Sequence, residues 1–376
     1  MTATNVSPAH EAYLSQRFFG SLNGLRFVCI VAVMWHHSPL NGAAQNVRLL
    51  ERGFVGVDFF FVLSGFLITT LLLREEARKG RISLRGFYWR RALRILPVYL
   101  LLVTAMSIYW IVVKGQSDPG YVPYYYLFLA NFLKGDIPLL SITWSLSVEE
   151  QYYLLWPAAL IVLPTMARFR VGVLVLAIFL CLLAMLGLAD WLNLPVIETE
   201  HARFVLPGMS YSAILMGSLA AVCLHRPRGF RVLYGVTAWR GAPVVYFGVL
   251  ALYLHLVPAN LLGWPAFGMD ILMVLTLASL VVREDHVLRP VMAWRPVARI
   301  GEISYGLYLY HLIGRHIATE IAHALNVTGF VQDVVISLLF AVFSILLAEV
   351  SFRFFESHFL KLKAWPSRRR QAAVVE

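Results

Sequence analysis

The feature that most limits the fold of this chain is a series of long apolar runs with almost no charge. The run Val171–Ala189, for example, contains no charged residue. Roughly 20 helical residues cross the ~30 Å hydrocarbon core of a bilayer. Of the 376 residues, 59% are hydrophobic and 14% are charged, which exceeds the apolar content of soluble domains. The sequence therefore predicts an integral membrane protein. Its continuous runs differ from the short alternating segments of a β-barrel.

Ten such runs predict an all-α protein with about ten transmembrane helices. The seventh is the weakest, because it is short and bounded by prolines, and losing it would reverse the orientation of everything after it. The predicted spans are Gly24–Leu40, Phe54–Leu73, Ile95–Val113, Leu146–Leu163, Val171–Ala189, Val205–Leu224, Val244–Pro258, Trp264–Val282, Ile303–Ala322 and Phe330–Phe352.

The distribution of basic residues predicts that both termini face the cytoplasm. With that orientation the inner segments hold 25 of the 32 Lys and Arg residues, the outer segments hold five, and two lie within spans. Cytoplasmic loops are rich in Lys and Arg, so the formal charge of +11 follows from membrane orientation and does not indicate a nucleic-acid partner.

We expect a single membrane domain over residues 1–376, with spans between 24 and 355 and cytoplasmic tails at 1–20 and 356–376. The first twenty residues have no apolar core before a small-residue cleavage site, which predicts no removable signal peptide. The aromatic stretch Tyr121–Tyr126 favours an interfacial or re-entrant segment on the outer side. The three cysteines lack metal-type spacing, so we expect no metal site.

The first span carries Arg26 near its inner end and His36 and His37 near its outer end. Ionisable groups at such depth are energetically unfavourable and favour a function. Arg26 and His37 are eleven residues apart, which places them on one helix face about 16 Å apart. Arg26 suits an incoming phosphate or carboxylate, and His37 suits a general base. The alternatives are an arginine that snorkels and a histidine that only bonds a neighbouring helix.

Asp58 lies a short way into the otherwise apolar second span. A carboxylate at this position needs a partner. His36 or His37 is the nearest candidate in the predicted topology, and a His–Asp pair would orient the ring. The alternative is a charge that the helix macrodipole stabilises near an N-terminus.

The loop before the third span holds eight basic residues between Arg74 and Pro97. Arg90, Arg91 and Arg94 lie within about one helical turn, where guanidinium groups can clamp phosphates. Binding of anionic lipid head groups is the alternative for this loop.

Two adjacent carboxylates, Glu149 and Glu150, lead into the fourth span and project about 100° apart. One of them can therefore face a polar interior. Ser147 followed three residues later by Glu150 also fits a capping box, which would be a purely structural role.

The ninth span has a polar stripe in which Ser304, Tyr308 and His311 recur at helical spacing, and Arg315 continues it one turn on. A polar face of this length faces protein or a cavity. Interhelical hydrogen bonding is the alternative role for Ser304 and Tyr308.

Taken together, these segments resemble the bacterial acyltransferase family 3 proteins, the membrane O-acyltransferases of the nodulation-factor and O-antigen-modifying type. The likeness covers most of the chain, and the five motifs in this order are highly specific. They are Arg26 followed after ten residues by His37, then Gly56–Thr69, Arg90–Pro97, Trp144–Pro157 and Ile303–His311.

The resemblance implies transfer of an acyl group, usually acetyl from cytoplasmic acetyl-coenzyme A, to a hydroxyl of a glycan or glycosylated small molecule. It implies no permanently bound cofactor and a place in the cell membrane. His37 would be the catalytic histidine with Arg26 as its motif partner. The remaining assignments are phosphate binding by Arg90, Arg91 and Arg94, orienting or acceptor-binding roles for Asp58, Glu149 and Glu150, and substrate binding by Trp144, Ser147, Tyr305 and His311.

The chain departs from the family pattern at two points. The histidine of the first helix is doubled, and Glu356-Ser-His stands where relatives commonly place a proline two residues after the glutamate. A transporter or flippase for a lipid-linked glycan is the alternative function, since it also needs polar groups within helices. The sequence leaves open the acceptor, the acyl length and the oligomeric state.

Overall fold

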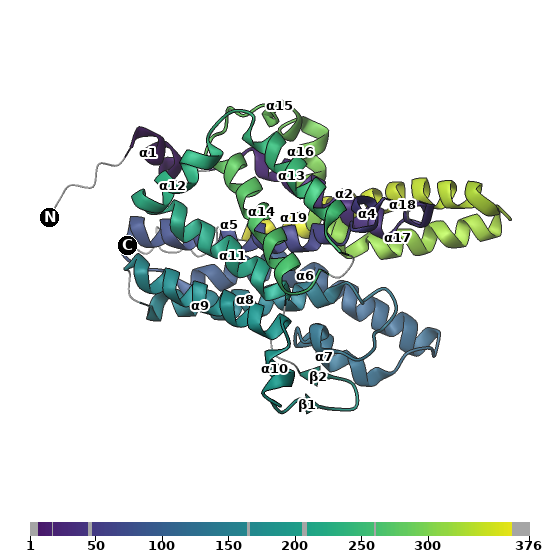
Figure 1. The fold of residues 1–376 in the computed structure, drawn as a ribbon. Coiled ribbons are helices and arrows are strands. Elements are labelled where there is room, and N and C mark those ends of the chain that lie inside the picture. Colours follow the sequence, from purple (N-terminus) through teal and green to yellow (C-terminus); the bar gives the residue numbers. More distant parts are fainter. Residues whose placement is uncertain are drawn as a thin grey trace, which may run out of the picture. The chain divides into compact units, whose positions relative to one another are not determined.

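The computed structural model describes residues 7–16, 18–43, 47–163, 166–204, 209–258 and 261–362, and it is mostly helical (Figure 1). The chain forms two compact units. Unit 1 consists of Met1–Ile82, Val148–Ile197 and Phe204–Glu302, and unit 2 consists of Ser83–Ser147, Glu198–Arg203 and Ile303–Glu376.

Unit 1 holds most of the helices in the first and middle parts of the chain. They are α1 (Pro8–Ser15), α2 (Ser21–His37), α3 (Leu40–Ala43), α4 (Arg48–Glu51), α5 (Val55–Lys79), α9 (Ala167–Met185), α10 (Leu188–Trp191), α11 (Met209–Leu224), α12 (Pro227–Thr237), α13 (Ala242–Leu256), α14 (Trp264–Val281), α15 (Arg289–Met292) and α16 (Arg295–Glu302).

Unit 2 holds three further long helices, α6 (Leu84–Ser107), α17 (Ser304–Ala324) and α18 (Gly329–Ser351), together with short helices and turns. The short helices are η1 (Ile108–Val113), η2 (Pro119–Tyr121), α7 (Val122–Tyr126), η3 (Ala130–Phe132), η4 (Phe352–Glu356) and α19 (Ser357–Lys361). The chain passes between the units within α8 (Thr143–Val162) and within the short strands β1 (Ile197–Glu198) and β2 (Arg203–Phe204).

Each of the ten predicted spans coincides with a helix, although residues 205–208 of the sixth lie outside the described residues. Among the described residues, five helices are long and apolar enough to cross a membrane. The bent pair α12 and α13 makes a sixth if it forms one span. The prediction of a multi-pass helical protein is therefore confirmed, and the count of ten stays a prediction.

The core of unit 1 is built on a very close approach of α5 and α11. A Cβ atom added at Gly65 would lie 1.9 Å from the carbonyl oxygen of Ile214, and one added at Gly217 would lie 2.0 Å from that of Val62. Small residues permit such backbone contact between membrane helices. The two glycines therefore fix how α5 and α11 pack.

One helical turn after Gly65, four side chains of unit 1 form a hydrogen-bonded series that we call the hydroxyl chain. Its members are Thr69, Tyr152, Trp156 and Ser218. The Trp156 indole N–H donates to Thr69 Oγ1 at 2.8 Å, and the Tyr152 hydroxyl lies 3.2 Å from Thr69 Oγ1 and 2.6 Å from Ser218 Oγ. Ser218 donates onward to the Ile214 carbonyl at 2.8 Å. Because Ser218 uses its proton there, Thr69 donates to Tyr152 and Tyr152 donates to Ser218. Every donor in the hydroxyl chain is therefore used.

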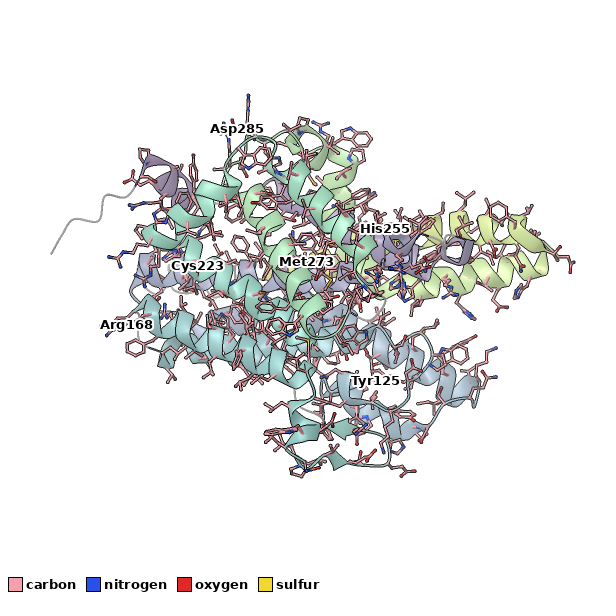
Figure 2. All side chains as sticks on the ribbon, viewed as in Figure 1. Tyr125, Arg168, Cys223, His255, Met273 and Asp285 are labelled. Atoms are coloured by element: carbon pink, nitrogen blue, oxygen red, sulfur yellow. The ribbon has the colours of Figure 1, made fainter. Side chains whose placement is uncertain are left out.

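The aromatic stretch of unit 2 folds as short turns, as the sequence predicted for a segment that does not span. Tyr125, labelled in Figure 2, is buried and receives the Ile137 N–H at 2.9 Å, while the Tyr99 hydroxyl donates to its carbonyl at 2.7 Å. Phe128 and Leu139 adopt positive φ angles of 53° and 69°, a conformation that L-residues rarely take. Hydrogen bonds to Tyr99 and Ile137 thus hold the segment in place.

Candidate active site

Arg26 and His37 both lie on α2, as the spacing predicted. Both side chains are half-buried. The Arg26 guanidinium donates to Asn23 Oδ1 at 2.7 Å, which holds it toward the start of the helix. His37 is the last residue of α2, where the helix dipole stabilises a positive charge. The two groups therefore lie at opposite ends of one helix.

The two neighbouring histidines are held by different backbone carbonyls. His37 Nδ1 donates to the Val33 carbonyl at 2.9 Å, and His36 Nδ1 donates to the Glu51 carbonyl at 3.3 Å. Because a carbonyl oxygen can only accept, Nδ1 carries the proton and Nε2 carries the lone pair in each neutral ring. Their centroids lie 5.1 Å apart with an interplanar angle of 81°. The last two residues of α2 thus present two imidazole rings with different orientations.

Asp58 is almost completely buried in unit 1, with 4% of its surface exposed. Within the described residues its carboxyl makes no hydrogen bond with His36 or His37, so the expected His–Asp pair is not formed. Instead Asp58 interacts electrostatically with Asp270 on α14. Asp58 lies in the first turn of α5, and this helix packs against α11 and α14 as well as α2.

Asp270 is the buried residue that the sequence analysis missed. It is fully buried, and its Oδ2 accepts from Ser212 Oγ at 2.7 Å, while Oδ1 has no hydrogen-bond partner among the described residues. We call Asp58, Ser212 and Asp270 the carboxyl cluster. A signal was present, because Asp270 is the lone charge in the run Trp264–Val282 and such a charge is a functional candidate.

The two glutamates of α8 are both half-buried. Glu149 Oε1 accepts a short hydrogen bond of 2.6 Å from Ser64 Oγ on α5, so this carboxylate faces a polar partner inside unit 1. The alternative capping box is wrong, because α8 begins at Thr143 and Ser147 lies inside it. Ser147 Oγ instead donates to the Thr143 carbonyl and accepts the Ala130 N–H, each at 3.1 Å.

The three arginines of the basic motif lie on α6 in unit 2. Arg90 and Arg94 are exposed and Arg91 is half-buried. Arg94 also interacts electrostatically with Glu356. Since the three follow one another at positions i, i+1 and i+4 of a continuous helix, they share about one turn, as predicted.

The polar stripe of α17 is buried at Ser304, Tyr308 and His311, as expected. His311 is fully buried, and its Nδ1 donates to the Tyr308 carbonyl at 2.6 Å. The Tyr308 hydroxyl donates to the Ile142 carbonyl at 3.0 Å. Arg315 lies on the same face of α17 at 100° per residue, but it is exposed, so the buried part of the stripe ends at His311.

Two other residues predicted to bind substrate, Tyr305 and Trp144, also lie in unit 2. The Tyr305 hydroxyl donates to the Ile95 carbonyl at 2.9 Å. Trp144, the second residue of α8, is half-buried. Unit 2 thus brings Trp144, Tyr305 and His311 into one compact body, while unit 1 brings together the histidines and buried carboxyls.

These features define a helical, multi-pass membrane protein with histidine, arginine and carboxyl groups within its helices. A family model described as an acyltransferase domain, that of acyltransferase family 3, matches residues 19–350. The chain belongs to this family. The resemblance drawn from its motifs is thereby confirmed.

Relatives of the chain are named as O-acetyltransferases. The chain is 27% identical over 368 residues to the peptidoglycan O-acetyltransferase OatA of Listeria monocytogenes, covering 91% of this chain and 56% of that protein. It is 25% identical over 368 residues to the O-acetyltransferase OatA of Staphylococcus aureus, covering 92% and 58%. The chain therefore spans somewhat more than half the length of these relatives. No solved structure matches it.

Proposed function

We propose that this acyltransferase moves an acetyl group from acetyl-coenzyme A to a hydroxyl of a glycan or glycosylated small molecule. Support comes from the family and from relatives named as O-acetyltransferases, one of them acting on peptidoglycan. We also propose ten spans with both termini in the cytoplasm, one membrane domain, and residence in the cell membrane. The family assignment favours an enzyme over the transporter that the sequence left as an alternative.

The observation that carries the mechanism is the hydrogen bond from His37 Nδ1 to the Val33 carbonyl at 2.9 Å. It fixes the tautomer in which Nε2 is basic. In direct transfer, Nε2 takes the proton of the acceptor hydroxyl as its oxygen attacks the thioester carbonyl. The tetrahedral intermediate then expels the coenzyme A thiolate, which receives that proton from the imidazolium. In the relay version, Nε2 attacks the thioester and the coenzyme A thiolate leaves. The acceptor hydroxyl then attacks the acetylated imidazole, Nε2 regains its lone pair, and the hydroxyl proton passes to the thiolate.

The other predicted residues serve binding and orientation in this proposal. Arg90, Arg91 and Arg94 bind the donor phosphates, for which guanidinium groups are well suited. Arg26, about 16 Å along α2 from His37, binds a negatively charged part of a substrate. The remaining residues orient or bind the substrates: Asp58, Glu149, Glu150, Trp144, Ser147, Tyr305 and His311.

The test compares His37→Ala with His36→Ala in the purified, membrane-inserted full chain. Radiolabelled acetyl-coenzyme A is supplied with and without a crude glycan extract, and thioester consumption is followed. Loss of a positioned general base lowers the rate on the order of 100-fold or more, so we expect that loss in His37→Ala. The matched variant His36→Ala, which removes the adjacent ring, is expected to keep most of the activity.

Two results would contradict the proposal. If His37→Ala consumed the donor as fast as the unmodified chain, both the direct and the relay mechanism would be wrong. If the unmodified chain consumed neither acetyl-coenzyme A nor longer acyl donors, the assignment of coenzyme A thioesters as donors would be withdrawn.

A further inference from the structure

Helix α12 meets helix α13 at 78° across a short break. Three hydrogen bonds fix this corner. The Tyr246 hydroxyl donates to the Val236 carbonyl at 3.0 Å, Arg283 Nη1 donates to the Ala238 carbonyl at 3.1 Å, and the Val287 N–H donates to the Arg240 carbonyl at 3.0 Å. If α13 crosses the membrane, α12 consequently runs nearly parallel to the membrane surface.

The inner face of α12 is packed and fixes its rotation about its own axis. Phe230 is buried with 2% of its surface exposed, and its ring lies 4.6 Å from that of His10 and 5.6 Å from that of Tyr13, both on α1. On the same helix, a Cβ added at Gly229 would lie 2.4 Å from the Cys223 carbonyl oxygen. The opposite face of α12 is therefore held toward the outside of unit 1.

That outer face combines cations with large apolar side chains. Arg228 and Arg231 are exposed and make no hydrogen bond or ion pair with any other residue that the structure describes. Val232 and Val236 are 69% and 48% exposed, and Trp239 in the corner is 47% exposed. The arginines are three residues apart and the valines four, so each pair forms a stripe and the stripes adjoin.

We propose that α12 lies in the plane of the membrane surface and binds anionic phospholipid head groups through Arg228 and Arg231. Val232, Val236 and Trp239 then reach the boundary between head groups and acyl chains. A helix with adjoining basic and apolar stripes suits this position, and exposed tryptophan is favoured there. The competing arrangement makes α12 the inner half of a broken span, which would place two unpaired guanidinium groups in hydrocarbon at high cost.

The positive charge of the arginine stripe determines which lipid binds to α12. A neutral head group offers no net attraction to two arginines. Each basic residue near an anionic leaflet, in contrast, raises the binding constant about fivefold. This inference does not depend on the proposed acetyl transfer, because α12 carries none of the residues placed in that reaction.

The experiment places a photoreactive amino acid at Val236 in the full chain, reconstituted in nanodiscs of phosphatidylcholine with a minor share of phosphatidylglycerol. Mass spectrometry identifies the lipid that becomes attached after irradiation. We expect phosphatidylglycerol to be enriched on the order of fivefold or more over its share in the bilayer. The enrichment should be lost in Arg228→Gln/Arg231→Gln and kept in Arg228→Lys/Arg231→Lys, with thermal unfolding unchanged in both.

The matched control carries the same photoreactive group at Leu176 on α9, which is 56% exposed and six residues beyond Arg170. Lipid should attach there in proportion to its share of the bilayer. The proposal is overturned if Val236 attaches no lipid, or if it attaches both lipids in bilayer proportion, as the inner half of a span would. It is also overturned if millimolar coenzyme A removes the enrichment, since the arginines would then bind a soluble phosphate.

Discussion

The carboxyl cluster and the hydroxyl chain both connect α5 and α11 inside unit 1, yet they differ in how their polar atoms are partnered. On α5, Asp58 precedes the close contact at Gly65 by two turns and Thr69 follows it by one. In the hydroxyl chain each donor has an acceptor. In the carboxyl cluster Asp270 accepts from Ser212, but its Oδ1 has no partner among the described residues, and the second acid, Asp58, interacts with it electrostatically.

This difference separates two uses of polarity inside a membrane protein. A fully satisfied neutral network stabilises one packing of the helices. Buried acids that lack enough donors destabilise the fold and are retained where chemistry needs them. We therefore expect changes in the hydroxyl chain to affect stability alone, and changes in the carboxyl cluster to affect activity beyond any effect on stability.

The largest effect should come from the contact that lies between the two clusters. Gly65→Ala would place a methyl group 1.9 Å from the Ile214 carbonyl oxygen, so α5 and α11 must separate and both clusters lose their geometry. Overpacking usually costs about 1–3 kcal/mol and occasionally more, and because the clash here is with a backbone atom we expect about 3 kcal/mol or more. Thermal unfolding in detergent measures it. The control is Gly172→Ala on α9, where nothing lies within 4 Å and we expect equal or slightly higher stability.

The next effect tests the carboxyl cluster itself. Asp270→Ala leaves a cavity and an unpartnered Ser212 hydroxyl, so we expect a loss of about 2–3 kcal/mol. Asp270→Asn keeps a carbonyl oxygen for Ser212 and should cost less than about 1 kcal/mol. Both variants should lose acetyl transfer if the acid is needed. An Asp270→Asn protein with full activity would assign this acid to the structure alone and end the contrast between the clusters.

A smaller effect should follow from opening the hydroxyl chain. Thr69→Val removes the acceptor for the Trp156 indole and leaves that buried N–H without a partner, at a cost of about 1–2 kcal/mol. Thr69→Ser restores the hydroxyl and most of the stability. Activity per folded molecule should stay unchanged in both variants, as measured by donor consumption after correction for the folded fraction. A drop of tenfold or more would show that the hydroxyl chain takes part in the reaction.

The sequence predicted the helices well because a helix that crosses a membrane needs a continuous apolar run of about 20 residues, whether or not it is buried in the protein. It also predicted that one of Glu149 and Glu150 faces a polar interior, and Glu149 does contact Ser64. It could not predict the electrostatic interaction of Asp58 with Asp270, since this depends on how α5, α11 and α14 rotate against one another. The glycine contacts of α5 and α11 set that rotation, and they join residues about 150 positions apart in the chain.

The smallest effect is expected at the surface, where a polar contact is open to solvent. Asp118 in unit 2 accepts the Gly120 N–H at 2.7 Å and contacts His201 Nε2 at 2.8 Å. The Gly120 amide first, and His201 second, hold the pKa of the Asp118 carboxyl below its usual value. A lowered pKa means that the folded state favours the ionised acid, so the stabilisation is present above the ordinary aspartate pKa and is lost as the pH falls through the lowered one.

Hydrogen exchange of the loop amides around Gly120, corrected for the intrinsic pH dependence, measures this loss. In the unmodified chain, protection should decrease as the pH is lowered below about 4, whereas Asp118→Asn should show weaker protection at neutral pH and little further decrease in acid. Because the pair is exposed, solvent screens it, and unfolding of the whole chain should not change. An equal acid response in both proteins would show that Asp118 does not hold this loop, and that satisfied polar contacts stabilise this protein only where they are buried.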